Sequence, residues 1–120
     1  MRPRKNQSLA VRLRFAFTGL WEGVRAEHSL RYQLVALGGV VALLAIYRPE
    51  AFWWALVALA ASAVLTAELL NTALERLVDH LHPQVHEQIR LVKDCAAAAV
   101  LIASCGALAV GIALAVRLFG

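Results

Sequence analysis

The sequence predicts an all-α membrane protein. Three observations support this prediction: the high mean hydropathy, the grouping of apolar residues into long runs, and the positions of the charged residues. Hydrophobic residues make up 61% of the 120 residues, and the mean hydropathy of +0.66 exceeds that of an ordinary soluble domain. Most apolar residues fall in three uncharged runs, at 32–47, 51–67 and 95–116. A chain of this length suits a single domain over residues 1–120.

The segment 8–31 predicts an amphipathic helix on the membrane surface. Apolar side chains recur in it at steps of three and four residues: Leu9, Leu13, Ala16, Phe17, Leu20 and Val24. Seven of the twelve basic residues lie before residue 32: Arg2, Arg4, Lys5, Arg12, Arg14, Arg25 and Arg31. Such a segment favours anionic lipid headgroups over nucleic acid. Within it, Gly19 and Gly23 predict a bend or a close helix contact.

Three transmembrane helices are expected, at about 32–48, 51–80 and 87–118, because each hydrophobic run approaches the length of a bilayer span. The basic N-terminal segment and the loop around 76–93 should face the cytoplasm, since basic residues concentrate on that side. The short turn near Pro49 and the C-terminus would then face outward. The chain should therefore be a multi-pass protein whose N-terminus is cytoplasmic.

The stretch "AELLNTALERLVD", residues 67–79, puts polar groups on an otherwise apolar helix. Because successive residues of a helix are rotated by about 100° around its axis, these polar side chains occupy one sector of roughly 100°: Glu68, Asn71, Thr72, Glu75 and Asp79. Glu68 lies roughly 26 Å along the helix from residue 51, at the inner edge of the hydrocarbon, and Glu75 lies about 10 Å further into water. This stripe should face protein or water, either as a site or as the end of a membrane helix.

The start of the third hydrophobic helix, "HEQIRLVKDCA", carries a second polar set. His86, Arg90 and Lys93 fall within about 60° of one another, and Asp94 stands beside Lys93. A lysine can hold phosphate, and an aspartate can hold Mg²⁺; the alternative for Lys93 is snorkelling to the interface. Together with the acidic stripe, this set favours phosphoryl transfer to a lipid alcohol without a Walker loop.

Histidines cluster between the second and third helices, where His80, His82 and His86 lie near Glu87. The spacing of His82 and His86 would suit a zinc site on one helix, but Pro83 interrupts the helix between them. A solvated loop, in which His86 touches nucleotide, is the other interpretation.

The two motifs together resemble the prokaryotic integral-membrane diacylglycerol kinase family, which includes undecaprenol kinases. "AELLNTALERLVD" fits the family pattern E-x-x-N-S/T-A-I/L-E-x-x-x-D, and "KDCAAAAVLIA" fits A-K-D-x-x-A/S-A-A-V-L except that Val92 replaces the usual Ala. The resemblance covers nearly the whole chain. It implies a homotrimeric helical bundle in the bacterial inner membrane, with active sites shared between subunits.

The resemblance also implies chemical roles for three carboxylates. Glu68 would be the catalytic base that binds the lipid hydroxyl and takes its proton. Glu75 would bind Mg²⁺ and ATP together with Glu27, which matches by its place after "GLWEGVRA" and before "SLR". The residues "HSL" after Glu27 differ from those common in the family, which leaves the choice of lipid open.

For the nucleotide, the resemblance implies four further ATP-binding residues. Asn71, Lys93 and Asp94 would organise the phosphates, and His86 would contact the nucleotide from the loop. The expected activity is ATP-dependent phosphorylation of diacylglycerol to phosphatidic acid. The alternatives are an undecaprenol kinase that makes undecaprenyl phosphate and, from another class, a non-enzymatic membrane oligomer such as a pore or transporter subunit.

Overall fold

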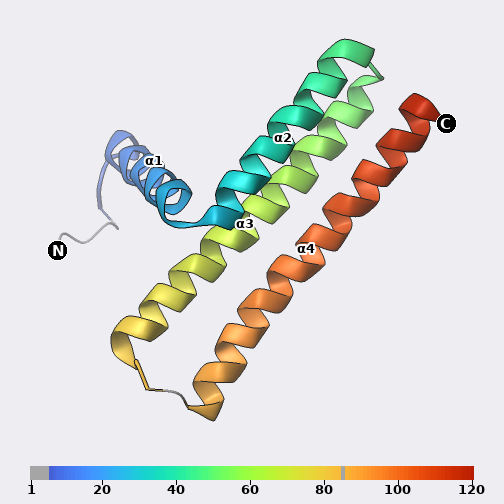
Figure 1. Ribbon diagram of the computed structural model, residues 1–120. Helices are drawn as coiled ribbons and strands as arrows, with labels where there is room; N and C mark the ends of the chain where they lie inside the picture. The colour runs from blue at the N-terminus through green and yellow to red at the C-terminus, as the bar shows by residue number, and fades with distance from the viewer. Residues whose placement is uncertain (1–5, 85) are drawn as a thin grey trace.

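A computed structural model describes residues 6–84 and 86–120, and in those ranges the chain folds into α-helices joined by short connections (Figure 1). In chain order the helices are α1 Leu9–Ala26, α2 His28–Tyr47, α3 Ala51–Leu81 and α4 Glu87–Phe119. α2, α3 and α4 are each long and apolar enough to cross a membrane. The prediction of an all-helical protein with three such helices is confirmed, while Arg2, Arg4 and Lys5 lie outside the described residues.

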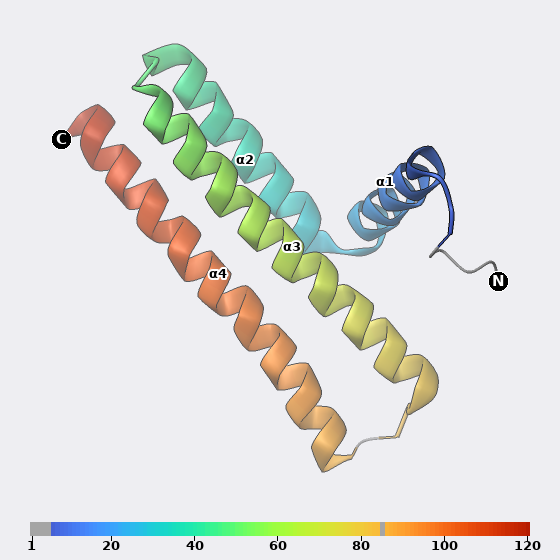
Figure 2. The same cartoon turned by 180° about the vertical axis from the view of Figure 1, so that it is seen from behind.

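Each long helix runs antiparallel to the next one along the chain, and α3 lies between α2 and α4 (Figures 1 and 2). α1 stands to one side, next to the first turns of α2 and the middle of α3. With 31 residues, α3 is about 46 Å long, and α4 has 33 residues. Both therefore exceed a bilayer span, and the ends of α3 and α4 that share a connection project beyond the start of α2.

The junction between α1 and α2 corrects the predicted surface helix, which was expected to continue from residue 8 to residue 31. α1 ends at Ala26, Glu27 adopts an extended backbone (φ −114°, ψ 121°), and α2 begins at His28. The Arg31 side chain explains the break. Its Nη1 donates to the carbonyls of Val24 at 3.0 Å and Arg25 at 2.7 Å, so a residue of α2 caps the C-terminus of α1.

The turn between α2 and α3 is short because two neighbouring residues stop the helix. Arg48 lies in the left-handed region at φ 48°, and its backbone N–H donates to the Leu44 carbonyl. Pro49 follows and cannot continue the hydrogen-bond pattern of a helix. α3 then begins at Ala51, as the sequence predicts. Near the C-terminal end of α4, the Arg117 guanidinium donates a hydrogen bond to the Glu50 carboxylate of this turn.

A cluster of buried apolar residues lies in the half of the bundle near this turn. Leu44, Val57 and Leu114 come from α2, α3 and α4 and pack together. The rings of Tyr47 and Phe119 meet edge to face, with centroids 5.1 Å apart. We call the half of the bundle near the α2–α3 turn the apolar half. The remainder, which contains the α1–α2 junction and the α3–α4 connection, is called the polar half.

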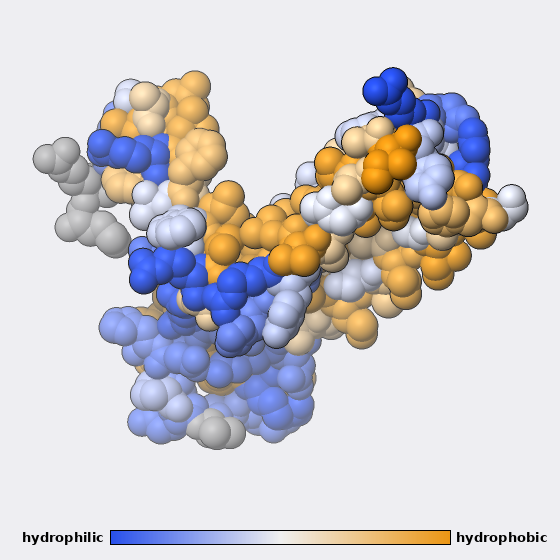
Figure 3. All heavy atoms as spheres, turned by 45° about the horizontal axis from the view of Figure 1, so that its top comes forward, coloured by the Kyte–Doolittle hydropathy of each residue, from blue (hydrophilic) through white to orange (hydrophobic). Residues whose placement is uncertain are grey.

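The long helices expose most of their apolar side chains. Only 6–11% of each candidate span is buried within the chain. Figure 3 shows hydrophobic residues spread over the helices and hydrophilic residues gathered around the α3–α4 connection. An exposed apolar surface of this kind is stable only against lipid or another protein surface. The predicted homotrimer would cover part of it, and it stays a prediction.

Candidate active site

Glu68 is the buried carboxylate of the polar half. It lies on α3 with 8% of its surface exposed. Gln33 of α2 donates a hydrogen bond from Nε2 to Glu68 Oε1 at 2.9 Å. Thr72, one turn further along α3, is buried to the same extent. Because a buried carboxylate is costly without a donor, the α2–α3 contact at Gln33 accounts for the burial of Glu68.

An apolar groove of about 380 Å³ runs between α2 and α4, with α3 as its floor. Its lining includes Gln33 on α2 and Val64 on α3. Glu68 follows Val64 by four residues, and therefore lies about one helical turn beyond it on the same face of α3. The groove thus leads from the core of the apolar half to the Gln33–Glu68 pair.

Asn71 points to a different part of the site from Glu68. It lines a second groove, of about 930 Å³, that is bounded by α3 and α4 and also touched by Gln88 and Cys95. Asn71 Oδ1 is buried and accepts no hydrogen bond from residues 6–84 or 86–120. The predicted polar stripe is therefore divided, because Glu68 bonds to α2 whereas Asn71 borders the space beside α4.

Glu27 and Glu75 are the carboxylates expected to hold Mg²⁺, and both are half-buried. Glu27 forms the link between α1 and α2, and its N–H donates to the Gly23 carbonyl at 2.9 Å. Gly23 is buried, and a Cβ there would lie 2.9 Å from Leu69 Cδ2 of α3. The predicted close contact at Gly23 is confirmed; it brings the end of α1 against the residue that follows Glu68.

Lys93 is paired across helices. Its Nζ donates to Asp79 Oδ1 at 2.7 Å, which joins the start of α4 to the end of α3. Asp79 ends the polar stripe, so the two motifs found in the sequence meet through this bond. The Lys93 ammonium keeps two further donor positions for an anionic ligand.

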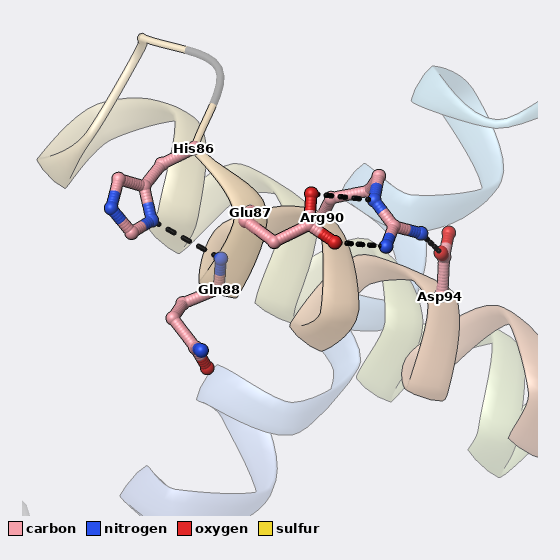
Figure 4. Close-up of polar contacts among 5 residues, drawn as sticks. All are labelled: His86, Glu87, Gln88, Arg90 and Asp94. Carbon is pink, nitrogen blue, oxygen red and sulfur yellow. Dashed lines mark hydrogen bonds and ion pairs between the residues drawn. The ribbon is translucent and has the colours of Figure 1, made fainter.

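Asp94 is held by Arg90, one turn earlier on α4 (Figure 4). Arg90 Nη1 donates to Asp94 Oδ2 at 2.7 Å, and the same guanidinium binds Glu87. His86 caps the helix, since its Nδ1 accepts a hydrogen bond from the Gln88 N–H at 3.1 Å. Lys93 and Asp94 therefore point to different partners, and His86 remains exposed in the loop.

The described residues bring fewer than three side chains of the metal-binding types together at any one place. Over residues 6–84 and 86–120, no three or more His, Cys, Asp or Glu side chains come together as a metal site, including the histidines of the α3–α4 connection. A nucleotide-bound Mg²⁺ needs less, because one or two carboxylates and the phosphate oxygens suffice. Glu27 and Glu75 suit such a shared ion by their chemistry.

Sequence reasoning missed the partners of these residues. Gln33 lies in an uncharged run of the sequence. The feature that could have identified it is that its polar amide interrupts an otherwise apolar helix. Arg31 counted only as one more basic residue of the surface segment. The pairing of Asp79 with Lys93 left no signal, because it depends on how two helices pack.

The chain is similar in sequence to known prokaryotic kinases. Residues 14–115 match the prokaryotic diacylglycerol kinase family. The chain is 36% identical over 105 residues to a diacylglycerol kinase of Synechocystis sp., a match that covers 87% of this chain and 60% of that protein. It is 30% identical over 84 residues to an undecaprenol kinase of Bacillus subtilis, covering 70% of this chain and 68% of that protein.

Proposed function

The chain belongs to the prokaryotic diacylglycerol kinase family, and we propose that it is an ATP-dependent membrane lipid kinase that phosphorylates diacylglycerol to phosphatidic acid. One observation supports a lipid substrate above the others. The buried Glu68 carboxylate is hydrogen-bonded to Gln33, which lines an apolar groove between membrane-length helices. An acyl chain in that groove would bring the attached hydroxyl group to Glu68.

In the proposed reaction, Glu68 is the general base. Its carboxylate takes the proton of the lipid hydroxyl as the hydroxyl oxygen attacks the γ-phosphorus of ATP. A new phosphorus–oxygen bond to the lipid forms, the bond to the bridging oxygen of ADP breaks, and ADP leaves. Glu68 then returns its proton to water. Such transfer depends mainly on positioning and on neutralisation of phosphate charge.

Charge neutralisation falls to groups on α3, on α4 and at the α1–α2 junction. Glu27 at the α1–α2 junction and Glu75 on α3 would hold Mg²⁺, which lowers the repulsion between the phosphates and the attacking oxygen. Lys93 would bind phosphate oxygens with the donors that Asp79 leaves free. Asn71 and Asp94 would order the nucleotide beside α4, and His86 would contact it from the connection before α4.

A homotrimer is the proposed assembly. The candidate spans bury only 6–11% of their residues within one chain, and the groove beside Asn71 is bounded by α3 and α4 alone. A neighbouring copy would complete the wall of that groove. The proposed location is the bacterial inner membrane, with the N-terminus and the α3–α4 connection in the cytoplasm.

The second candidate function is undecaprenol phosphorylation, which the match to the Bacillus subtilis relative supports. It uses the same base and nucleotide and differs only in the lipid alcohol. The non-enzymatic alternative, a pore or transporter subunit, gives no reason for the motif residues around Lys93 and Asp94.

Label transfer tests the proposal. The full chain is reconstituted in vesicles that contain equal amounts of dioleoylglycerol and undecaprenol, with Mg²⁺ and γ-labelled ATP. We expect label in phosphatidic acid. Label in undecaprenyl phosphate alone would overturn the lipid assignment, and no label in either product from folded protein would overturn the kinase assignment.

A further inference from the structure

Gln33 makes the one hydrogen bond that fixes the Glu68 carboxylate within the described residues. The two residues lie 35 positions apart in sequence, on α2 and α3, and Nε2 donates to Oε1 at 2.9 Å. Glu68 is 8% exposed, so solvent replaces this bond poorly. The bond occupies one carboxylate oxygen and leaves the other without a partner from the described part of the chain.

The orientation of the Gln33 amide is set by electrostatics. If the amide turned over, its oxygen would face the carboxylate oxygen and the pair would repel. The observed orientation leaves Gln33 Oε1 buried, with no hydrogen-bond donor for it among the residues that the structure describes. An unpaired buried acceptor costs about 1–3 kcal/mol. The protein therefore retains a polar group at a costly position, where its other end holds the carboxylate.

Gln33 also lies where the apolar groove reaches Glu68. Apart from Gln33, the residues that line the groove are apolar except for Ser104 on α4. A hydroxyl group in the groove can therefore contact Gln33, which is hydrogen-bonded to Glu68. The position of the carboxylate relative to that hydroxyl is thus controlled from α2, whereas the carboxylate itself belongs to α3.

We propose that Gln33 is a positioning residue for the phosphoryl-transfer reaction: its amide anchors one oxygen of Glu68, so that the other oxygen faces the hydroxyl group of the lipid. This role rests on the proposed kinase function and assigns a residue outside both sequence motifs. An amide suits the task because it donates a hydrogen bond without taking up or releasing a proton. A carboxyl group at the same place would compete with Glu68 for a proton.

The charged groups on the elements around Glu68 leave Gln33 as its partner. On α2, Arg31 binds the carbonyls of α1 and also lies 2.6 Å from His28 Nδ1. On α4, Arg90 binds Glu87 and Asp94. Lys93 of α4 is paired with Asp79. Of the carboxylates assigned to the metal, Glu75 lies about two turns further along α3 and Glu27 lies at the α1–α2 junction.

The test compares two near-isosteric variants of the full chain in vesicles of dioleoylglycerol, Gln33→Glu and Gln33→Met. For each, kcat and the KM for ATP are measured between pH 5.5 and pH 9. With Gln33→Glu, two neighbouring carboxyl groups share a proton, so the low-pH limb of the kcat profile should move up by about one pH unit or more. With Gln33→Met, kcat should fall about tenfold while the KM for ATP changes less than about twofold.

Ser104→Ala is the matched control, since it removes the other polar group of the groove without touching Glu68, and it should leave the limb in place. If Gln33→Glu lowers activity equally at every pH without moving the limb, Gln33 has only a structural role and the inference is overturned. An unmoved limb together with wild-type kcat in Gln33→Met overturns it as well. Failure of the kinase proposal looks different, because the wild-type chain itself would then transfer no phosphate.

Discussion

The two halves of the bundle differ in the kind of contact that crosses between helices. In the apolar half, Leu44, Val57 and Leu114 pack without direction, and Tyr47 meets Phe119. In the polar half, hydrogen bonds and ion pairs of defined direction join the helices, as at Gln33–Glu68 and Lys93–Asp79. Apolar packing holds the helices together, whereas directed bonds fix the position of individual reactive groups. The two halves should therefore respond differently to mutation.

The largest expected effect comes from the base itself. Glu68→Gln keeps the size of the side chain but removes the proton acceptor, so kcat should fall by about 10²–10⁴-fold. The KM for ATP should change little, because Glu68 is assigned to the lipid hydroxyl. Full turnover in this variant, measured by label transfer in vesicles, would remove Glu68 from the mechanism. Unchanged hydrogen exchange in α3 serves as the control for folding.

The second effect tests how α1 is seated on the polar half. Gly23→Leu places side-chain atoms where even a Cβ lies 2.9 Å from Leu69 and 3.3 Å from Leu30. Overpacking of this kind costs about 1–3 kcal/mol, and α1 can relieve it by moving away from α3. Because Glu27 is linked to the end of α1, we expect the KM for Mg-ATP to rise about tenfold or more.

Gly19→Leu is the matched control for that prediction. It lies one turn earlier on the same helix, and a Cβ there meets nothing within 4 Å. Leucine also favours the helix over glycine by up to about 1 kcal/mol. Activity should therefore stay within about twofold of wild type. Equal losses in the two variants would mean that α1 responds to leucine anywhere along its length, and that the Gly23 contact is not what positions Glu27.

The third effect separates the junction between α1 and α2 from the rest of the polar half. Arg31→Met removes the guanidinium that caps the Val24 and Arg25 carbonyls. Hydrogen bonds to a charged group contribute about 1.5–3 kcal/mol each when they are shielded from water. We expect faster hydrogen exchange at the end of α1 and a rise of about tenfold in the KM for Mg-ATP. Arg31→Lys keeps the charge but cannot bridge two carbonyls and His28, so it should restore activity only in part.

How far the sequence predicts this molecule depends on how local each signal is. The helices after the turn, Ala51–Leu81 and Glu87–Phe119, begin at the predicted residues because Pro49 and Pro83 interrupt the chain before them. The break at Glu27 was not predicted, since the glycines of residues 8–31 indicated a bend only at Gly19 or Gly23. At that break, the Arg31 side chain of α2 caps the carbonyls at the end of α1, a contact between two helices that sequence spacing does not reveal.

The candidate site divides in the same way. Spacing alone put Glu68, Asn71 and Glu75 on one side of a helix, because helical phase is a local property. It did not reveal that Glu68 bonds to α2 whereas Asn71 borders the groove beside α4. The partners Gln33 and Asp79 belong to other helices, and helix packing decides such pairs.

The smallest expected effect concerns an ion pair of the apolar half, which joins Glu50 in the α2–α3 turn to Arg117 near the end of α4. The hydrogen bond from Arg117 lowers the pKa of the Glu50 carboxyl below its ordinary value of 4.5. A lowered pKa in the folded state means that the pair contributes to stability above the unfolded pKa and that this contribution is lost as the pH falls through the folded value.

Both side chains are exposed, at 57% and 50%, so Glu50→Gln should lower the thermal midpoint by at most about 2 °C at pH 7. The difference from wild type should decline as the pH falls below 4.5 and should also shrink in high salt. Arg117→Gln should behave identically, and the double variant should add nothing further. Thermal unfolding in detergent micelles measures all three, and a large, pH-independent loss in Glu50→Gln would show that the turn, like the polar half, depends on a directed bond.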